Sequence, residues 1–304
     1  MQFTTCSKAA AAIEPRLIPV EGALNTRDIG GYPTQSGQKI RFGKVFRSSE
    51  LSYVSDAGVA VLAGLNLSYV VDFRGVKEAA DAPDRLPEGV RVVAAPIIRD
   101  DLDPARIDEY LGRHSFPPAM YDRERVSAYG PYYRMLTLVN SYEEPGYVDA
   151  VAAYRPLFQS ILELPEDRAL LAHCTGGRDR TGVGIFLLMT ALGVPEELAL
   201  SDYLKSNVYL QPERQNPKST AFRQYRFSNI YTQPPENEAF TDMAAALGTT
   251  SQAIYDSIRL RPEFPKSLMA NIEARYGKFS TFLEQKMGVG TQELLELKRR
   301  LLTD

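Results

Sequence analysis

The segment 173–182 contains residue types that together can bind an anion and attack it with a nucleophile. Its sequence is His-Cys-Thr-Gly-Gly-Arg-Asp-Arg-Thr-Gly. Cys174 and Arg180 bracket a glycine-containing turn, whose backbone N–H groups can all point at one bound phosphate. Arg180 can bind the phosphate oxygens with a bidentate fork. The same positive field favours the thiolate form of Cys174, which is a nucleophile. The spacing therefore predicts a phosphatase that works through a phosphocysteine intermediate.

A Cys-x5-Arg spacing alone is a weak signal, and the flanking segments make it more specific. The apolar run 168–174 is typical of a short strand, and the run 181–192 is typical of an apolar helix that ends at Gly193. Cys174 would then lie at the carboxyl end of a strand and just before a helix, where open α/β sheets bind their ligands. The alternative is an inert buried cysteine with a surface arginine, and this setting disfavours it.

The phosphate-loop sequence resembles that of the bacterial and fungal tyrosine phosphatases related to the mycobacterial phosphatase PtpB and the Listeria phosphatase LipA. Other segments resemble this family in the same order: 25–32, 46–51, 71–75, 202–207 and 276–283. The resemblance implies a cysteine-phosphatase-like fold with a helical lid over the site. The family's usual Ala-Gly-Lys within the loop is replaced here by Gly176-Gly177-Arg178.

The elements that must position these residues alternate along the chain. Strands are predicted at 44–47, 67–73 and 90–98, with a helix at 55–64 between the first two. This order predicts an α/β fold with a largely parallel central sheet flanked by helices. We expect residues 1–20 to form a flexible arm and 21–304 a single phosphatase domain. Within it, the tyrosine-rich segment 100–145 is either a lid or a helical subdomain that only packs on the core, and 208–304 is helical.

Each residue of the candidate site has a predicted role. Cys174 is the nucleophile and Arg180 binds the phosphoryl oxygens. Asp179 is our candidate general acid, a role that the family resemblance assigns to an aspartate at this loop position; the alternative is a structural carboxylate. Substrate binding is expected from the rest of the loop and from two residues near it: Thr175, Gly176, Gly177, Arg178, Thr181, Asp72 and Arg74.

Several of these residues have a second interpretation. Thr181 either donates a hydrogen bond to the thiolate or only caps the helix. Asp72, at a strand end, is the second candidate for the general acid. We expect His173 to brace the loop rather than to act as a base. Arg47 either approaches the phosphate or forms a surface ion pair with Glu50 or Asp56. Asn25, Arg27 and Asp28 resemble the family's N-terminal signature, and the latter two are expected to brace a turn.

Composition limits the other classes of function. The chain has 304 residues, of which 44% are hydrophobic and 24% charged, as in a globular catalytic domain. A net charge of −3 with no basic stripe argues against nucleic-acid binding. Two cysteines (Cys6 and Cys174) and two histidines (His114 and His173) predict neither a disulfide framework nor a histidine-rich metal site. No cofactor motif, transmembrane run or signal-peptide pattern is present, so we expect a cofactor-free cytoplasmic enzyme, with secretion left open if a leader was removed.

The substrate class is less well determined. We expect phosphotyrosine proteins or small phosphomonoesters, with dual specificity and activity on phosphoinositides as a further prediction because Arg178 keeps a positive charge in the loop. Phosphate, sulfate or vanadate should bind the same loop. The alternatives are an inositol-phosphate phosphatase, a pseudophosphatase that only binds phosphate, and a sulfur-chemistry enzyme such as a rhodanese or arsenate reductase.

Overall fold

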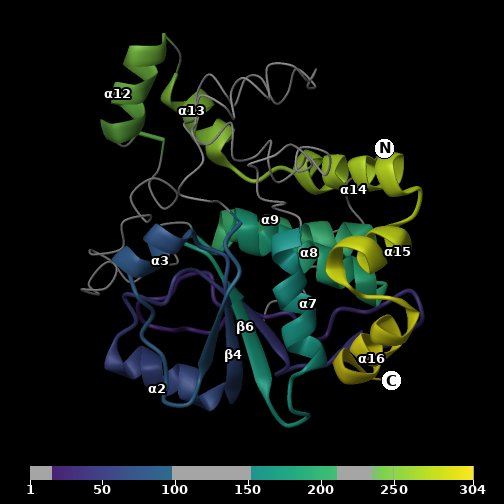
Figure 1. Ribbon diagram of the computed structural model, residues 1–304. Coiled ribbons are helices and arrows are strands. Elements are labelled where there is room, and N and C mark those ends of the chain that lie inside the picture. The colour runs from purple at the N-terminus through teal and green to yellow at the C-terminus, as the bar shows by residue number, and fades with distance from the viewer. Residues whose placement is uncertain (1–15, 98–151, 211–234, 237, 249, 304) are drawn as a thin grey trace.

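The computed structural model describes residues 16–97, 152–210, 235–236, 238–248 and 250–303 (Figure 1). Its centre is a five-stranded sheet in the order β1-β3-β6-β4-β5. The β1–β3 pair is antiparallel and the other three pairs are parallel. The strands are β1 (Arg27–Asp28), β3 (Val45–Ser48), β4 (Leu67–Asp72), β5 (Arg91–Ala94) and β6 (Ala169–His173). The predicted α/β fold with a largely parallel sheet is confirmed.

The central strand β6 is buried along its whole length because both faces of the sheet are covered. Leu170 and Ala172 belong to one hydrophobic cluster, and Ala169 and Leu171 belong to the other. The alternation follows from the two-residue period of a strand. The first cluster is shared with α7 (Arg155–Leu162), α8 (Asp179–Leu192) and α16 (Thr291–Leu301), and the second with α2 (Asp56–Gly64), which lies on the opposite side of the sheet in Figure 1.

The ends of two helices follow their local sequence signals. Ser55 caps α2 by accepting a hydrogen bond from the backbone N–H of Gly58 at 3.1 Å. Gly193, with a φ of 83°, ends α8 in the left-handed conformation that glycine adopts most easily. Helix α8 begins at Asp179, two residues before the predicted start, so Asp179 and Arg180 form its first turn.

The remaining described helices are α3 (Val76–Asp81), α9 (Glu196–Tyr209), α12 (Glu238–Leu247), α13 (Ser251–Ile258), α14 (Glu263–Tyr276) and α15 (Phe279–Phe282), with a 3-10 turn at Ala152–Tyr154 and a π-helical turn at Leu283–Met287. The part expected to be wholly helical ends in strand β7 (Leu302–Thr303), which pairs with β2 (Lys39–Ile40). Among the described residues, no helix is both long and apolar enough to cross a bilayer.

Three of the predicted regions fall partly or wholly outside the described residues. The lid segment 100–145, most of the arm (residues 1–15), and residues 211–234, 237, 249 and 304 of the C-terminal part lie outside them. Residues 16–20, which we placed in the arm, are packed instead. Arg16 and Val20 are buried, and Leu17 forms a β-bridge with Arg27. The hydrophobic side chain of Val20 joins the cluster under α2, which explains why this end of the arm is ordered against the core.

Candidate active site

Cys174 lies directly after β6, at the carboxyl end of the central strand. The preceding residue, His173, is in register with Ser48 of β3 and Asp72 of β4, so three strand ends meet at this point. Cys174 is buried and forms no disulfide. The position is the one that the sequence predicted, at the end of a strand where α/β sheets form their sites.

The loop 174–180 turns tightly from β6 into α8. Gly177 has a φ of 61°, and a Cβ at this position would lie 2.2 Å from the carbonyl oxygen of Ser48. Only glycine fits both the backbone conformation and the close approach to β3. The loop is also fixed at its start, because the N–H of Glu50 donates to the carbonyl oxygen of Thr175 at 3.0 Å.

Arg180, in the first turn of α8, forms an ion pair that the sequence did not reveal. Its two terminal nitrogens donate to the two carboxylate oxygens of Glu78 at 2.7 and 2.9 Å, and one of them also donates to Oγ1 of Thr175 at 3.0 Å. Burial would raise the pKa of Glu78, but its hydrogen bonds and charge attraction to Arg180 lower it overall. Thr175 also donates to Glu78.

The only local signal for Glu78 is its place as the third residue of α3, where its carboxylate accepts from the N–H of Gly75 as in a capping box. That signal predicts a helix start and gives no indication of a contact with Arg180, 102 residues away.

The other loop residues are buried around the turn. Arg178 and Asp179 are only 2% and 8% exposed. Thr181 is fully buried, and within the described residues its hydroxyl oxygen makes no hydrogen bond, so the donation to the thiolate is not made in this structure. The hydroxyl nevertheless lies one residue after Arg180, on the first turn of α8.

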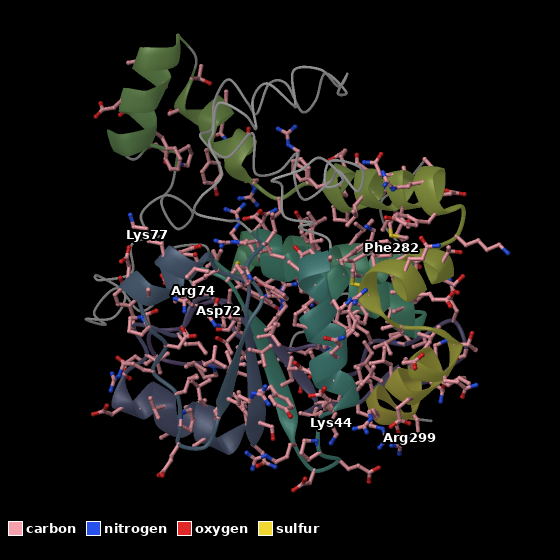
Figure 2. All side chains as sticks on the ribbon, in the orientation of Figure 1. Lys44, Asp72, Arg74, Lys77, Phe282 and Arg299 are labelled. Carbon is pink, nitrogen blue, oxygen red and sulfur yellow. The ribbon has the colours of Figure 1, made fainter. Side chains whose placement is uncertain are left out.

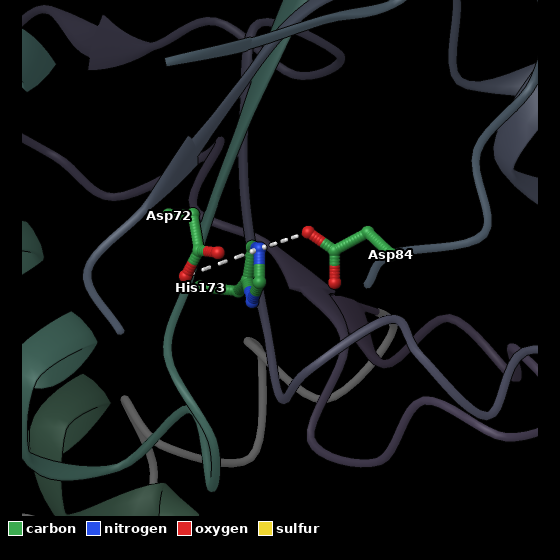
Figure 3. A group of neighbouring side chains, drawn as sticks. All are labelled: Asp72, Asp84 and His173. Carbon is green, nitrogen blue, oxygen red and sulfur yellow. Dashed lines mark hydrogen bonds and ion pairs between the residues drawn. The ribbon is translucent and has the colours of Figure 1, made fainter. Parts of the chain in front are cut away.

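On one side of the loop lies a group that we call the acidic cluster: Glu50, Asp72, Asp84, Arg74 and His173. Arg74 donates to Asp72 from both its backbone N–H (2.9 Å) and its guanidinium (2.8 to 3.0 Å), and forms ion pairs with Asp84 at 2.9 Å and Glu50 at 3.3 Å. His173 lies between Asp84, at 3.0 Å, and Asp72, at 3.7 Å (Figure 3). Burial would lower the pKa of His173, but the two carboxylates raise it to about 9. His173 is therefore charged at neutral pH and braces the strand end.

The side chains of Asp72, Asp84 and His173 are of the kinds that bind metal ions, and their ligand atoms lie within 4.8 Å of one another. The guanidinium of Arg74 already lies against both carboxylates. A cation is therefore supplied by the protein itself, and we assign no metal to this cluster. Burial would raise the pKa of Asp72, but His173 and Arg74 lower it, so Asp72 is ionised. Burial raises the pKa of Glu50 to about 7 against the opposing charges of Arg74 and His173.

On the other side of the loop lies a second group, which we call the cationic cluster: Arg27, Arg47 and Asp202. The carboxylate of Asp202, on α9, accepts from Arg27 at 3.0 Å and from Arg47 at 2.6 Å, and all three side chains are at most 1% exposed. Burial would raise the pKa of Asp202, but the two arginines hold it well below its usual range. Our expectation of a surface ion pair between Arg47 and Glu50 or Asp56 is wrong, because β3 turns Arg47 inward to a partner 155 residues away.

Arg27, expected to brace a turn, instead joins this cluster. The prediction for Asp28 is confirmed, since its carboxylate accepts from the N–H groups of Gly30 and Gly43 at 2.6 and 2.7 Å. Sequence could have shown that Asn25, Arg27, Arg47 and Asp202 all belong to segments resembling one family. It could not show that they meet behind one loop.

A separate hollow of about 190 Å³ lies at the other end of the sheet, lined mainly by basic side chains and by Glu166. Figure 2 shows two of these, Lys44 and Arg299, well away from Asp72 and Arg74. Its cations are already engaged: Arg299 pairs with Glu166 and Glu296, and Lys44 donates to the carbonyl of Glu166. The chemistry predicted from the sequence therefore lies at the carboxyl end of the strands and not in this hollow.

Comparison with known proteins identifies the family and relatives of this chain. The model of the tyrosine phosphatase family matches residues 18–303. The triple specificity protein phosphatase PtpB of Mycobacterium tuberculosis is 32% identical over 190 residues, which cover 61% of this chain and 67% of that protein. A Cupriavidus necator protein named among the tyrosine-protein phosphatases is 26% identical over 289 residues, or 94% of this chain and 90% of its own length. A tyrosine-protein phosphatase of Nostoc commune is 25% identical over 264 residues, covering 84% and 73%.

Proposed function

The chain belongs to the tyrosine phosphatase family, and from this premise we propose that it hydrolyses phosphotyrosine and related phosphomonoesters through a phosphocysteine at Cys174. One observation supports this most strongly. A buried cysteine at the end of the central strand is followed by a loop whose Gly177 lies against β3, and Arg180 is in the first turn of the next helix. This arrangement suits a phosphate dianion held above a thiolate.

In the proposed reaction, the sulfur of Cys174 attacks phosphorus in line with the departing alkoxide or phenolate oxygen. The S–P bond forms as the P–O bond breaks, and water later cleaves the S–P bond to release inorganic phosphate and regenerate the thiolate. The loop N–H groups and the guanidinium of Arg180 stabilise the charge on the phosphoryl oxygens in both steps. Thr175, Gly176, Gly177, Arg178 and Thr181 form the remainder of the proposed phosphate-binding loop.

The leaving oxygen needs a proton, and we propose Asp179 as the donor. Asp179 is on the first turn of α8, beside Arg180. The second candidate, Asp72, is ionised and held by several hydrogen bonds from Arg74, which makes it a poor acid. We assign Asp72 and Arg74 to bracing His173 and the strand ends.

A pair of conservative variants tests this assignment. Asp179→Asn should reduce turnover of an alkyl phosphate by about a hundredfold or more, and less with a good aryl leaving group that needs little protonation. Asp72→Asn should affect both substrates equally, through the geometry of the site. A collapse with Asp72→Asn and near-normal turnover with Asp179→Asn would reverse the two roles.

The finer substrate class is also a proposal. Arg178 adds a planar cationic side chain to the loop, and the related PtpB is named for triple specificity. Both features support activity on phosphoinositides in addition to phosphotyrosine. Comparing phosphotyrosine peptide, phosphoinositide, inositol phosphate and phosphoserine peptide tests this. Hydrolysis of phosphoinositides no faster than of phosphoserine would limit the enzyme to protein substrates.

The proposed lid, residues 100–145, belongs to the same test. Deleting this segment should change activity on bulky substrates and leave a small aryl phosphate largely unaffected. Equal effects on both substrates, or none, would count against a lid.

The first experiment is hydrolysis of an aryl phosphate by the wild type and by Cys174→Ser, with a metal chelator present. Turnover that is sensitive to vanadate and lost in the variant is the expected result. Turnover that persists in the variant would refute the assigned nucleophile. Tight binding of phosphotyrosine without turnover by the wild type would favour a phosphate-binding module.

A further inference from the structure

Two carbonyl groups of the phosphate loop are held from behind by side chains that the mechanism above does not use. The carbonyl oxygen of Gly177 accepts from Nδ2 of Asn25 at 2.9 Å and from a terminal nitrogen of Arg47 at 2.8 Å. The carbonyl oxygen of Gly176 accepts from the same Asn25 amide at 3.4 Å. Asn25 comes from the turn just before β1 and Arg47 from β3, and both side chains are buried.

Holding these carbonyls determines where the neighbouring N–H groups point. In a trans peptide the C=O and the following N–H lie on opposite sides of the chain, and the described residues contain no cis peptide. If the carbonyls of Gly176 and Gly177 face Asn25 and Arg47, the N–H groups of Gly177 and Arg178 face the other way. An anion held by these N–H groups would therefore bind on the side of the loop away from Asn25 and Arg47.

The cluster behind the loop also carries excess positive charge. Arg27 and Arg47 share one carboxylate, that of Asp202, and their other acceptors include the neutral side chains of Asn25 and Ser206. One positive charge is therefore not balanced within the cluster, in a place where solvent does not screen it. Burial and the charge of Arg27 lower the pKa of Arg47 to about 10, while the charges of Asp202 and of Cys174 oppose that shift.

We propose that Asn25 and Arg47 are positioning residues of the phosphate site: together they turn the loop N–H groups toward the bound phosphate, and the unbalanced charge of Arg47 favours the thiolate form of Cys174. This inference rests on the proposed function, because it assigns roles at the same loop. The inference goes beyond the proposed function because it assigns a role in catalysis to the cationic cluster, which lies behind the loop and does not itself contact the substrate.

Other charged groups also surround Cys174, and the test must separate Arg47 from them. They come from β6, from the loop, from the first turn of α8 and from α9 behind Arg47: His173, Arg178, Asp179, Arg180 and Asp202. Glu78, on α3, reaches the same region through Arg180. The variants below leave all of these residues in place.

Asn25 offers the sharpest pair of variants. Its φ of 61° is accessible to glycine, so Asn25→Gly removes the amide donor without backbone strain and without adding charge. Asn25→Asp removes the donor and adds a negative charge beside Arg27, which already donates to the Asn25 side-chain oxygen. The first variant changes only the geometry, and the second also balances the charge of the cluster.

Two measurements that do not depend on turnover follow these variants. The first is the dissociation constant of vanadate or inorganic phosphate. It should rise about tenfold in both variants, because each loses the hydrogen bonds that orient the loop. The second is the pH at which Cys174 becomes reactive to iodoacetamide. That midpoint should move up by about one pH unit in Asn25→Asp and stay unchanged in Asn25→Gly.

Variants of Arg47 give an independent check of the positioning and electrostatic roles, provided that thermal unfolding shows that they fold. Arg47→Lys keeps the charge but loses the fork, so it should weaken phosphate binding and leave the alkylation midpoint near that of the wild type. Arg47→Gln should change both. Arg85→Gln, which removes an arginine whose side chain is 50% exposed and paired with Asp56, is the control and should change neither.

The outcomes separate the two proposals. A wild type that binds neither phosphate nor vanadate would contradict the proposed function. A wild type that binds them, with both Asn25 variants binding equally well, would refute the positioning role alone. An alkylation midpoint that moves equally in Asn25→Gly and Asn25→Asp would refute the electrostatic part.

Discussion

Two clusters of buried charge flank the carboxyl end of β6, and they differ in sign and in what they hold. The cationic cluster has two arginines and one aspartate, and Arg47 donates directly to a carbonyl of the phosphate loop. The acidic cluster has three carboxyl groups against Arg74 and His173, and it holds the strand end through His173. The cationic cluster therefore has an excess positive charge behind the loop, whereas in the acidic cluster Arg74 and His173 offset the charge of two of the three carboxyl groups.

The difference shows how one loop can carry an anion site next to several acids. The carboxylates of the acidic cluster are paired with Arg74 and with His173, whose pKa they raise to about 9. They therefore repel a phosphate less than unpaired carboxylates would. In the part of the chain that the structure describes, Asp202 is the one acid paired with the two arginines of the cationic cluster, so one positive charge stays available to the proposed site. The following variants test this contrast.

The largest effect is expected from removing the shared carboxylate of the cationic cluster. Asp202→Asn leaves two buried arginines without an anionic partner, which should reduce the free energy of unfolding by about 3 to 5 kcal/mol. Asp84→Asn in the acidic cluster should cost about 1 to 3 kcal/mol, since Asp72 and Glu50 still face Arg74. Urea unfolding of both variants measures the difference, and equal losses would contradict the contrast between the clusters.

The next largest effect is expected from the acidic cluster, in the pH dependence of the free energy of unfolding. The pKa of His173 rises from 6.5 to about 9 on folding, so its contribution is complete below pH 6.5 and is lost as pH rises through 9. The free energy of unfolding should therefore fall by about 3 kcal/mol more in the wild type than in His173→Gln between pH 6 and 9.5. Parallel curves for the two proteins would show that His173 is not held charged.

The contact between the loop and β3 should give a large effect on activity. Gly177→Ala places a Cβ against the Ser48 carbonyl and strains the backbone, so turnover should fall by about a hundredfold or more. Gly193→Ala is the matched control, because its φ is also positive but, apart from its two chain neighbours, no atom of the described residues lies within 4 Å of the new Cβ. That variant should lose about 1 kcal/mol of stability and keep its activity. Loss of activity in both would point to general destabilisation.

The smallest effect is expected at Glu78, on the exposed side of the site. Its carboxylate accepts hydrogen bonds from Arg180 and Thr175, two residues that belong to the proposed phosphate site. Glu78→Gln should therefore bind inorganic phosphate about two- to fivefold more tightly and turn over more slowly, because Arg180 is held less firmly. Inhibition by phosphate measures the first effect, and weaker phosphate binding would show that Glu78 only supports Arg180.

The sequence was sufficient to predict four of the five strands of the central sheet and the place of Cys174, since these follow from local patterns, whereas the two-residue strand β1 was not predicted. The apolar run before Cys174 and the glycine after Leu192 mark the strand and helix on either side of the loop. The strand order was not predictable, because pairing between β3 and β6 joins segments more than 120 residues apart and leaves no periodic trace.

The supporting residues were harder to predict than the loop. Arg47 seemed a surface residue because Glu50 and Asp56 are near it in sequence, whereas its partner Asp202 is 155 residues away. Glu78 had only the signature of a helix start. The local sequence around a charged residue at a strand end does not identify the distant acid with which it pairs. Such networks are therefore recognised only from the three-dimensional structure.

The most direct test of the account is to trap the phosphoenzyme. Asp179→Asn should form the intermediate from an aryl phosphate with a good leaving group and hydrolyse it slowly, because the variant lacks the carboxylate that we propose as the base for the attacking water. Rapid acid quenching followed by peptide mass spectrometry should then find one phosphoryl group on Cys174. Turnover with no phosphoryl group on the protein, or with the group on another residue, would contradict the account.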